Sequence, residues 1–418
     1  MTDEVAVLVL RDNVLQNLAL SMTEQLGQEV LEAQTRLMRR LQAEGRLDRK
    51  VEQLPSDAEL VERRKHGKGL TRPECAVLLA YAKMTLYEDL LRTEIPDRAH
   101  LAIDVAKYFP RPLRRRFTTE IAQHRLKREI IATWIANSVV NRGLAVFVSE
   151  LEDETGNSLE DIMTAYVVAR DSFGLLGVWG AIEALPASVP GDVQTRLLVT
   201  VRGLLLRGTR WFMAQVGRPL RIGETVERFR PRIETVMRQL DDVLGPGQVA
   251  AMAAAQAEYE QAGVEPALAR TMAGLQQVLA ACDIVCVAPL DDEAALLRAA
   301  RSYFALENAL DLPWLKARIQ AAPRQGRWER LALTGLEEDL AGVLRRLTAA
   351  AMRAGIGEDN PAATQQRVEA WLDGTLLAGL RRYRALVGEL HQAADADLPM
   401  LTVAVRTLGE LVPRGGDA

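Results

Sequence analysis

The chain has 418 residues, of which 48% are hydrophobic, 26% are charged and 5% are aromatic. This composition is typical of a globular protein with a sizeable core and argues against long disordered segments. The 52 basic and 56 acidic side chains leave a net charge of −4, so no overall attraction to nucleic acid or to an anionic membrane is expected.

Apolar residues recur at helical spacing throughout the first half of the chain. Residues 5–22 carry one apolar stripe, and a second helix is expected over residues 28–44. Thr71, Pro73 and Glu74 then provide a clear helix start. The threonine can cap free backbone N–H groups, the glutamate can close a capping box, and a proline is tolerated in a first turn.

The strongest helical pattern extends from Thr119 to Asn141. Its apolar face is wide, so we expect one helix that is buried on more than one side, with Trp134 in the core. Polar residues along this helix could form a cluster: His124, Arg125, Arg128, Asn137 and Asn141. A neutral histidine is the usual general base, but no nucleophile or oxyanion donor is recognisable nearby. A buried polar network and a polar junction with another domain therefore stay open as the two interpretations.

Long helices rich in leucine and alanine follow a boundary near residues 186–191. We predict them at residues 192–216, 224–242, 246–262, 265–285, 290–309, 327–354, 363–391 and 398–411. The predicted domains are residues 1–188 and a helical bundle of residues 189–418. No alternation of short β-branched runs with helices occurs, and no GxGxxG motif is present. The predicted fold is therefore an all-α, multi-helix array or bundle without a Rossmann sheet, and no catalytic, cofactor-binding or metal-binding residue is assigned.

The chain contains three cysteines, Cys75, Cys282 and Cys286. A sparse, odd number does not suggest a disulfide framework, so we expect a reducing compartment, the cytoplasm. Only Asp283 offers a nearby oxygen ligand to Cys282 and Cys286, which favours small buried hydrophobic residues over a metal site. No signal peptide opens the chain and no uncharged apolar run reaches about 18 residues, so no membrane span is expected.

The stretch from Arg111 to Arg128 is the most basic part of the chain. Its cationic residues are Arg111, Arg114, Arg115, Arg116, Arg125, Lys127 and Arg128. Such a run could bind an anion or a nucleic acid. Glu120 and Glu129 lie within it, however, and the chain is acidic overall. A domain interface or a solvated surface is therefore favoured, and no nucleic-acid partner is expected.

Several ordered segments of about the first 180 residues resemble one family. They are Leu10-Arg-Asp-Asn13, Leu70-Thr-Arg-Pro-Glu74, Leu78-Leu-Ala-Tyr-Ala-Lys83, Tyr108-Phe-Pro110, His124-Arg-Leu-Lys-Arg-Glu-Ile-Ile-Ala-Thr133 and Ala165-Tyr-Val-Val-Ala-Arg170. Together they resemble the C-terminal helical region of the large bacterial NAD-specific glutamate dehydrogenases. Residues 190–418 resemble the family only as a helical region, rich in leucine and alanine, of similar position and length.

The resemblance implies that the catalytic machinery lies elsewhere. In that family the glutamate and NAD domains precede this region, so their catalytic lysines and glycine-rich nucleotide loop have no counterpart here. Met1 falls about where the nucleotide-binding domain ends, which implies an excised domain, a fragment or a split reading frame. The implied parent reaction is the oxidative deamination of L-glutamate to 2-oxoglutarate and ammonia, with reduction of NAD. NAD is thus a cofactor of the parent enzyme, and none is expected in this chain.

We therefore predict a structural, assembly or regulatory domain that packs on the glutamate dehydrogenase catalytic domains. The parent enzyme is expected to be a cytoplasmic homo-oligomer, and the isolated chain is expected to be inactive. The alternative is a stand-alone helical interaction or anion-binding protein without enzymatic activity. A free-standing enzyme with an unrecognised site in a helical cleft is a third hypothesis.

Overall fold

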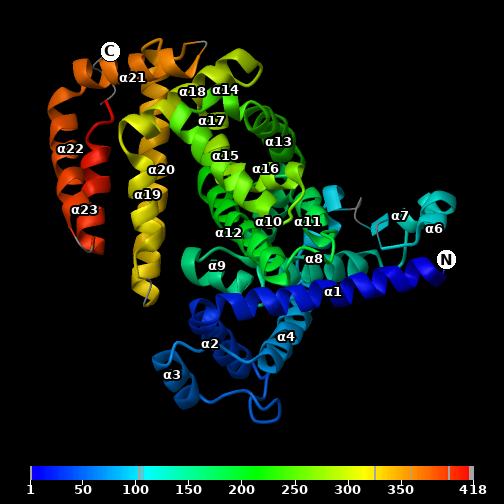
Figure 1. The fold of residues 1–418 in the computed structure, drawn as a ribbon. Coiled ribbons are helices and arrows are strands. Elements are labelled where there is room, and N and C mark those ends of the chain that lie inside the picture. The colour runs from blue at the N-terminus through cyan, green and yellow to red at the C-terminus, as the bar shows by residue number, and fades with distance from the viewer. Residues whose placement is uncertain are drawn as a thin grey trace. The chain divides into compact units, whose positions relative to one another are not determined.

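The computed structural model describes residues 2–101, 105–106, 108–323, 326–358, 360–393 and 396–413. The chain is 79% helical, and no strand occurs among the described residues (Figure 1). The all-α prediction is therefore confirmed. The chain divides into two compact units, Met1–Val226 and Glu227–Ala418, and the boundary in the sequence falls within helix α13 (Ile222–Arg238).

The first unit contains the helices that carry the predicted polar residues. Their bounds are α1 (Thr2–Leu26), α2 (Gln28–Ala43), α3 (Asp57–Lys65), α4 (Arg72–Leu91), η1 (Ile95–Asp97), η2 (Ala99–Leu101), α6 (Arg111–Arg116), α7 (Thr118–Ala122), α8 (Lys127–Gly143), α9 (Phe147–Thr155), α10 (Leu159–Ser172), α11 (Leu175–Glu183) and α12 (Gly191–Gln215). Helix α8 packs against α4, α1 and α12, so it is covered on several sides, as its wide apolar face predicts. Helix α10 packs along α12 in the same way.

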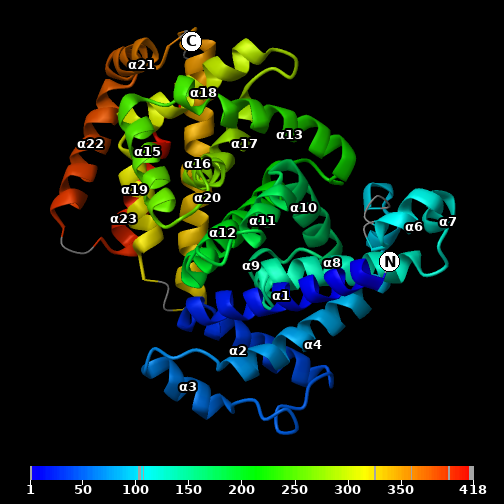
Figure 2. The same ribbon diagram turned by 45° about the vertical axis from the view of Figure 1, so that its right-hand side comes forward.

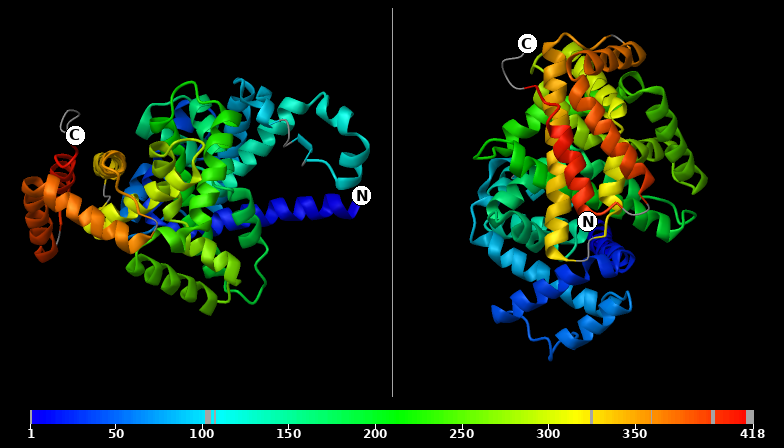
Figure 3. Two further views of the ribbon diagram at one scale, coloured as in Figure 1. Left: turned by 90° about the horizontal axis from the view of Figure 1, so that it is seen from above. Right: turned by 90° about the vertical axis from the view of Figure 1, so that its left-hand side faces the viewer.

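The second unit is also built from antiparallel and crossing helices. After α13 its helices are α14 (Leu240–Val243), α15 (Pro246–Gln261), α16 (Pro266–Gly274), α17 (Gln277–Val287), α18 (Glu293–Ala309), α19 (Leu312–Ala321), α20 (Arg327–Arg353), α21 (Pro361–Thr375), α22 (Leu377–Gln392) and α23 (Leu398–Gly409). Helix α18 packs against α17, α20 and α21, and α23 lies along α20 and α22 (Figures 2 and 3, yellow to red).

Several predicted boundaries are confirmed and others are wrong. The helices over 192–216, 246–262 and 327–354 match α12, α15 and α20 to within a residue or two at each end. The predicted helix 265–285 is two helices, α16 and α17, and 363–391 is likewise α21 and α22. Helix α19 was not predicted. The predicted domain boundary at 188 and 189 lies inside the first compact unit, because α12 packs on α10. Compactness does not test independent folding, so that boundary stays a prediction.

The start of α4 forms as its sequence predicts. Glu74 accepts a hydrogen bond from the backbone N–H of Thr71 at 2.7 Å, and Pro73 lies in the first turn. Both oxygens of the same carboxylate accept from Arg63, at 2.6 and 2.9 Å. A local capping signal therefore also joins α3 to α4.

The cysteines do not form a reactive group. Cys282 is buried and Cys286 is half-buried, and burial raises the pKa of both thiols. Asp283, the oxygen donor beside them, accepts from Arg345 at 2.8 Å and from Tyr303 at 3.3 Å. Among the described residues no group of His, Cys, Asp and Glu is arranged to hold a metal ion.

Helix α1 differs from the other long helices of the first unit in its exposure. Over Asp3–Leu26 it is long and apolar enough to cross a membrane, and 11% of its most apolar stretch is buried. Helices α8 and α9 reach a spanning length only together, and they are bent by 82°. Core helices of soluble proteins and signal sequences can also be this long and apolar, so the length and composition of α1 are weak evidence of a membrane span.

The prediction that Trp134 lies in the core is wrong. Its side chain is half-buried, and the Arg170 guanidinium lies 4.7 Å from its ring centroid. Trp179 on α11 is the buried tryptophan of this unit, at 1% exposure, and Arg142 lies 4.6 Å from its ring centroid. Periodicity placed Trp134 on an apolar face but did not show that the edge of this face reaches solvent.

The two tryptophans should therefore differ in their contributions to stability. Trp179→Ala is expected to lower the free energy of unfolding by about 3–5 kcal/mol, because it empties a large buried site. Trp134→Ala should cost roughly half as much, since part of its ring is already in water. Urea unfolding followed by circular dichroism measures both, with Trp328→Ala as the control because Trp328 is 78% exposed. Equal losses for the two variants would contradict the assignment.

Candidate functional site

The polar residues predicted between Thr119 and Asn141 do not lie on one helix. Helix α7 ends at Ala122, and α8 begins at Lys127. In the intervening turn, Nδ1 of His124 accepts a hydrogen bond from the backbone N–H of Leu126 at 3.1 Å. A side chain that bonds nearby backbone competes with the helical pattern. The prediction of a single helix over 119–141 is therefore wrong, and His124 and Arg125 lie in the turn before α8.

Arg128 holds α8 to the end of α4. Its Nη2 donates to the carbonyl oxygens of Leu91 at 2.9 Å and Thr93 at 3.2 Å, and its Nη1 pairs with Asp97. The last carbonyls of a helix lack intrahelical partners, and a cation beside them is favourable. The printed contacts of Arg128 thus lie within the first unit, and the choice between an internal network and a domain junction stays a prediction.

The two asparagines differ in their surroundings. Asn141 is 4% exposed, and its Oδ1 is buried without a hydrogen-bond partner among the described residues. Asn137 is half-buried. Between them, Ser138 shares a 2.7 Å hydrogen bond with the fully buried Tyr166 of α10. Their face of α8 therefore points into the unit, and no shared cluster of His124, Arg125, Arg128, Asn137 and Asn141 forms.

A larger set of buried ion pairs surrounds the C-terminal half of α8. Arg142 pairs with Glu183 of α11, and Glu183 also accepts from Arg11 of α1 at 3.0 Å. Burial lowers the pKa of Arg142, although the charge of Glu183 opposes that effect. Arg202 of α12 donates to the carbonyl of Gly143 at 3.0 Å and pairs with Glu150 at 2.9 Å. Sequence reasoning missed this set, even though Arg142 is a charged residue inside an apolar stretch.

Asp171 and Arg170 form a second buried pair, at the end of α10. Arg170 is 1% exposed, and its Nε and Nη2 donate to Asp171 at 2.6 and 2.9 Å. His100 of η2 approaches the same carboxylate at 2.8 Å. Burial disfavours the charged form of Asp171, but Arg170 and then His100 outweigh it and lower the pKa of this carboxyl. This pair fixes the segment around η2 on α10.

The basic segment from Arg111 to Arg125 faces solvent instead. Arg111, Arg115, Arg116 and Arg125 are exposed, and none forms an ion pair among the described residues. The backbone N–H of Arg111 donates to Glu4 of α1 at 2.8 Å, which ties α6 to the N-terminal part of α1. The Arg116 guanidinium lies 5.4 Å from the ring centroid of Phe117. A set of exposed, unpaired cations is suited to bind carboxylates or another anion.

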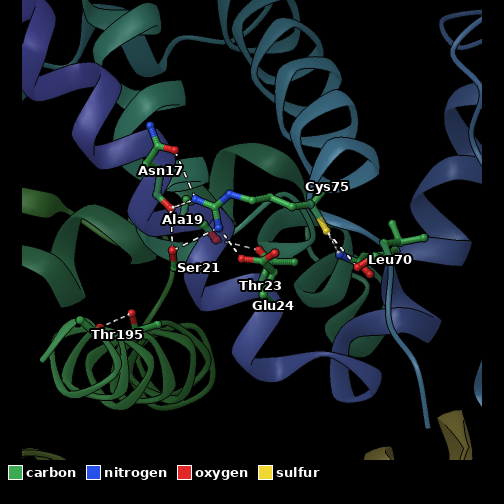
Figure 4. Close-up of polar contacts among 11 residues, drawn as sticks. Asn17, Ala19, Ser21, Thr23, Glu24, Leu70, Cys75 and Thr195 are labelled. Carbon is green, nitrogen blue, oxygen red and sulfur yellow. Dashed lines mark hydrogen bonds and ion pairs between the residues drawn. The ribbon is translucent and has the colours of Figure 1, made fainter.

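Two cavities of the first unit are small. One of about 40 Å³ lies among α2, α4, α8 and α9, and one of about 10 Å³ includes Gln34 and Cys75. Burial raises the pKa of Cys75 to about 11, and its thiol faces the Leu70 carbonyl at 3.8 Å (Figure 4). Cys75 is therefore a protonated, packed thiol at neutral pH and no nucleophile. Pockets for drug-sized ligands usually measure about 300–1,000 Å³, far more than either cavity.

Comparison with known proteins gives one consistent result. Residues 67–410 match the family described as "Glutamate dehydrogenase, C-terminal". The chain is 36% identical to the NAD-specific glutamate dehydrogenase of Halomonas elongata over 100% of its length and 26% of that protein. It is 37% identical to the Pseudomonas aeruginosa enzyme of the same name, over 98% of the chain and 25% of that enzyme. The chain is 31% identical to the Mycobacterium tuberculosis enzyme, over 100% of the chain and 25% of that enzyme. The chain spans about a quarter of the length of these curated relatives.

The partners of Arg128 predict its effect on the isolated chain. Arg128→Ala should lower the free energy of unfolding by about 1 kcal/mol, because the carbonyls at the end of α4 lose their charged donor. Arg125→Ala should leave the melting temperature unchanged, since Arg125 is exposed and unpaired. Differential scanning calorimetry of both variants measures this difference. A melting temperature that stays unchanged in Arg128→Ala would show that its contacts do not stabilise the unit.

The lowered pKa of Asp171 predicts a dependence of stability on pH. Because the pKa of Asp171 is lower in the folded state than its ordinary value of 3.8, the ionised carboxylate stabilises the fold at pH values above 3.8. This contribution to the free energy of unfolding is lost as the pH falls through the folded-state pKa. Asp171→Asn should cost about 3 kcal/mol near neutral pH, because Arg170 would stay buried without its carboxylate. Wild type and variant should converge in acid, where both carry a neutral side chain. A stability difference that persists unchanged in acid, by urea unfolding, would contradict the pairing.

Proposed function

Because the chain belongs to the glutamate dehydrogenase C-terminal family, we propose that it is an assembly domain that packs on the catalytic domains of an NAD-specific glutamate dehydrogenase. The parent enzyme converts L-glutamate and NAD to 2-oxoglutarate, ammonia and NADH. In this proposal the substrates and NAD bind to those catalytic domains, and this chain supplies no catalytic residue. The enzyme works as a homo-oligomer in the cytoplasm.

One observation carries the proposal: the chain aligns over its full length with about a quarter of proteins named NAD-specific glutamate dehydrogenase. The arrangement of charges supports a structural role. Arg142, Arg170 and Arg202 are buried and turned towards carboxylates of the same unit. Such pairs cost much to break and therefore favour one rigid packing over alternatives. A rigid helical body is suited to hold larger domains in a fixed arrangement.

The exposed cations support an alternative function. Arg111, Arg115, Arg116 and Arg125 could bind an anion in a stand-alone helical protein without enzymatic activity. Binding of this kind weakens steeply with salt, because it releases counterions. Retention of the chain on a phosphate-bearing resin that disappears with moderate salt, together with no effect on any dehydrogenase, would favour the alternative.

The proposal predicts the behaviour of a chimeric enzyme. Two variants of the Pseudomonas aeruginosa relative are made. In the deletion variant the quarter that matches this chain is removed, and in the chimera that quarter is replaced by this chain. Deletion should abolish oligomer formation and glutamate-dependent NADH production, and replacement should restore both. Sedimentation velocity and absorbance at the NADH band measure the two effects. A chimera that behaves like the deletion would contradict the proposed function.

The isolated chain provides a second measurement. It should show no glutamate-dependent reduction of NAD, because the proposal assigns every step to the catalytic domains. Turnover that co-purifies with the chain, and that is lost when one of its own residues is substituted, would contradict the assignment.

A further inference from the structure

The N-terminal half of α1 exposes an aliphatic surface. Its exposed side chains are Val5 at 46%, Val7 at 63%, Val9 at 55%, Leu10 at 63% and Val14 at 51%. Val7, Leu10 and Val14 follow each other at a spacing of three and then four residues, so they lie on one face of the helix. Monomeric proteins seldom leave a contiguous apolar surface of this kind in water, and such surfaces mark interaction sites.

The C-terminal half of the same helix is firmly attached to the first unit. Ala19 and Met22 are buried, and Arg72 of α4 reaches across to α1. Its guanidinium donates to Ser21 at 3.3 Å and to the Oδ1 of Asn17 at 3.2 Å, and it pairs with Glu24. Asn17, Ser21 and Glu24 appear together in Figure 4. Helix α1 is thus anchored at one end and exposed along the other (Figures 1 and 3).

Helices α6 and α7 lie beside the exposed end of α1 (Figures 1 and 2). The hydrogen bond from Arg111 to Glu4 joins the two parts. This neighbourhood adds apolar groups, since Phe117 is 37% exposed and Leu126 is 50% exposed. It also adds the exposed cations that have no ion pair among the described residues. We call the combined area the α1–α6 surface: Val5, Val7, Val9, Leu10, Val14, Phe117 and Leu126 with Arg111, Arg115, Arg116 and Arg125.

We propose that the α1–α6 surface is the docking site for the catalytic portion of the enzyme, and that this portion presents an aliphatic groove flanked by Asp and Glu. The inference rests on the proposed function and names its interface. An apolar helix face laid into a groove is a common mode of recognition, and the arginines would pair with carboxylates at its rim.

The relatives explain why this partner is favoured. The family is described as C-terminal, and the Halomonas elongata alignment includes all of this chain. From the word C-terminal we infer that the rest of that relative precedes the matched quarter and joins it at the counterpart of α1. A joined partner has a high effective concentration at the exposed end, so a surface of modest area suffices for stable docking.

Two other partners fit less well. A second copy of the chain would bring its own Arg115 and Arg116 towards the same cations, which repel each other. An anionic membrane would attract the cations, but Asp3, Glu4 and Asp12 lie on the same exposed part of α1 and oppose that attraction.

The decisive experiment uses the chimera described above with Val7→Asp and Leu10→Asp together. Both side chains are more than half exposed, so the melting temperature of the isolated chain should stay unchanged. In the chimera the same double substitution should raise the dissociation constant of assembly and lower the rate of NADH production by about tenfold or more. The reason is that docking would then bury two carboxylates in place of two apolar side chains. The matched control is Val403→Asp on α23, which is 48% exposed and lies outside the surface.

A second variant tests the charged part of the surface. Arg115→Glu with Arg116→Glu should weaken assembly of the chimera most at low salt, while Arg381→Glu, an exposed arginine of α22, should have no effect. If the unsubstituted chimera assembles and both α1–α6 variants also assemble normally, the docking site is wrong and the proposed function stands. If the unsubstituted chimera fails to assemble, both are wrong. If the isolated chain sediments with phosphatidylserine vesicles, the surface is instead assigned to a membrane. If the isolated chain sediments as a dimer, and Leu10→Asp abolishes that dimer, the surface is assigned to a second copy.

Discussion

Burial of guanidinium groups is the constraint on which the first unit depends. Arg142, Arg170 and Arg202 are almost removed from water, and each must find a carboxylate or carbonyl within the same group of helices. Removing one partner from such a pair typically costs about 3–5 kcal/mol, because the other charge stays buried. Apolar packing of α8, α10 and α12 would tolerate small shifts between helices. The charged pairs do not, because they require particular side chains to meet at hydrogen-bond distance.

Local signals in the sequence predicted most of the helices, and long-range pairing explains what they missed. The α4 start is encoded within Thr71, Pro73 and Glu74, so it could be identified without the fold. The break before α8 contains no glycine or proline and follows from a histidine that bonds the backbone two residues on. The partners of Arg128 and Arg142 lie on other helices, so no local pattern could distinguish an internal clamp from a junction residue. Of the predicted site, Arg125 lies on an exposed surface, Asn141 is buried, and Arg128 is partly exposed but bonds to other residues of the first unit.

Exposed and buried arginines have different neighbours in this unit. Arg142 and Arg202 lie on long helices and pair with acidic residues of other helices, whereas Arg170 pairs with the adjacent Asp171. The exposed arginines of the α1–α6 surface lie in the short helix α6 and in the turn before α8. Composition alone describes both groups as a balanced set of charges, which is why the net charge of −4 did not reveal a local cationic surface. Charge distribution, more than total charge, determines what such a protein attracts.

Glu183 receives hydrogen bonds from two arginines of very different exposure, Arg11 at the surface of α1 and Arg142 in the interior. Helix α1 is held to the first unit by Arg72 near its C-terminal end, by the Arg11–Glu183 ion pair and by the hydrogen bond from Arg111 to Glu4. The shared carboxylate thus joins an exposed arginine of α1 to a buried arginine of α8, so loss of Glu183 would release Arg11 and leave Arg142 buried without this carboxylate.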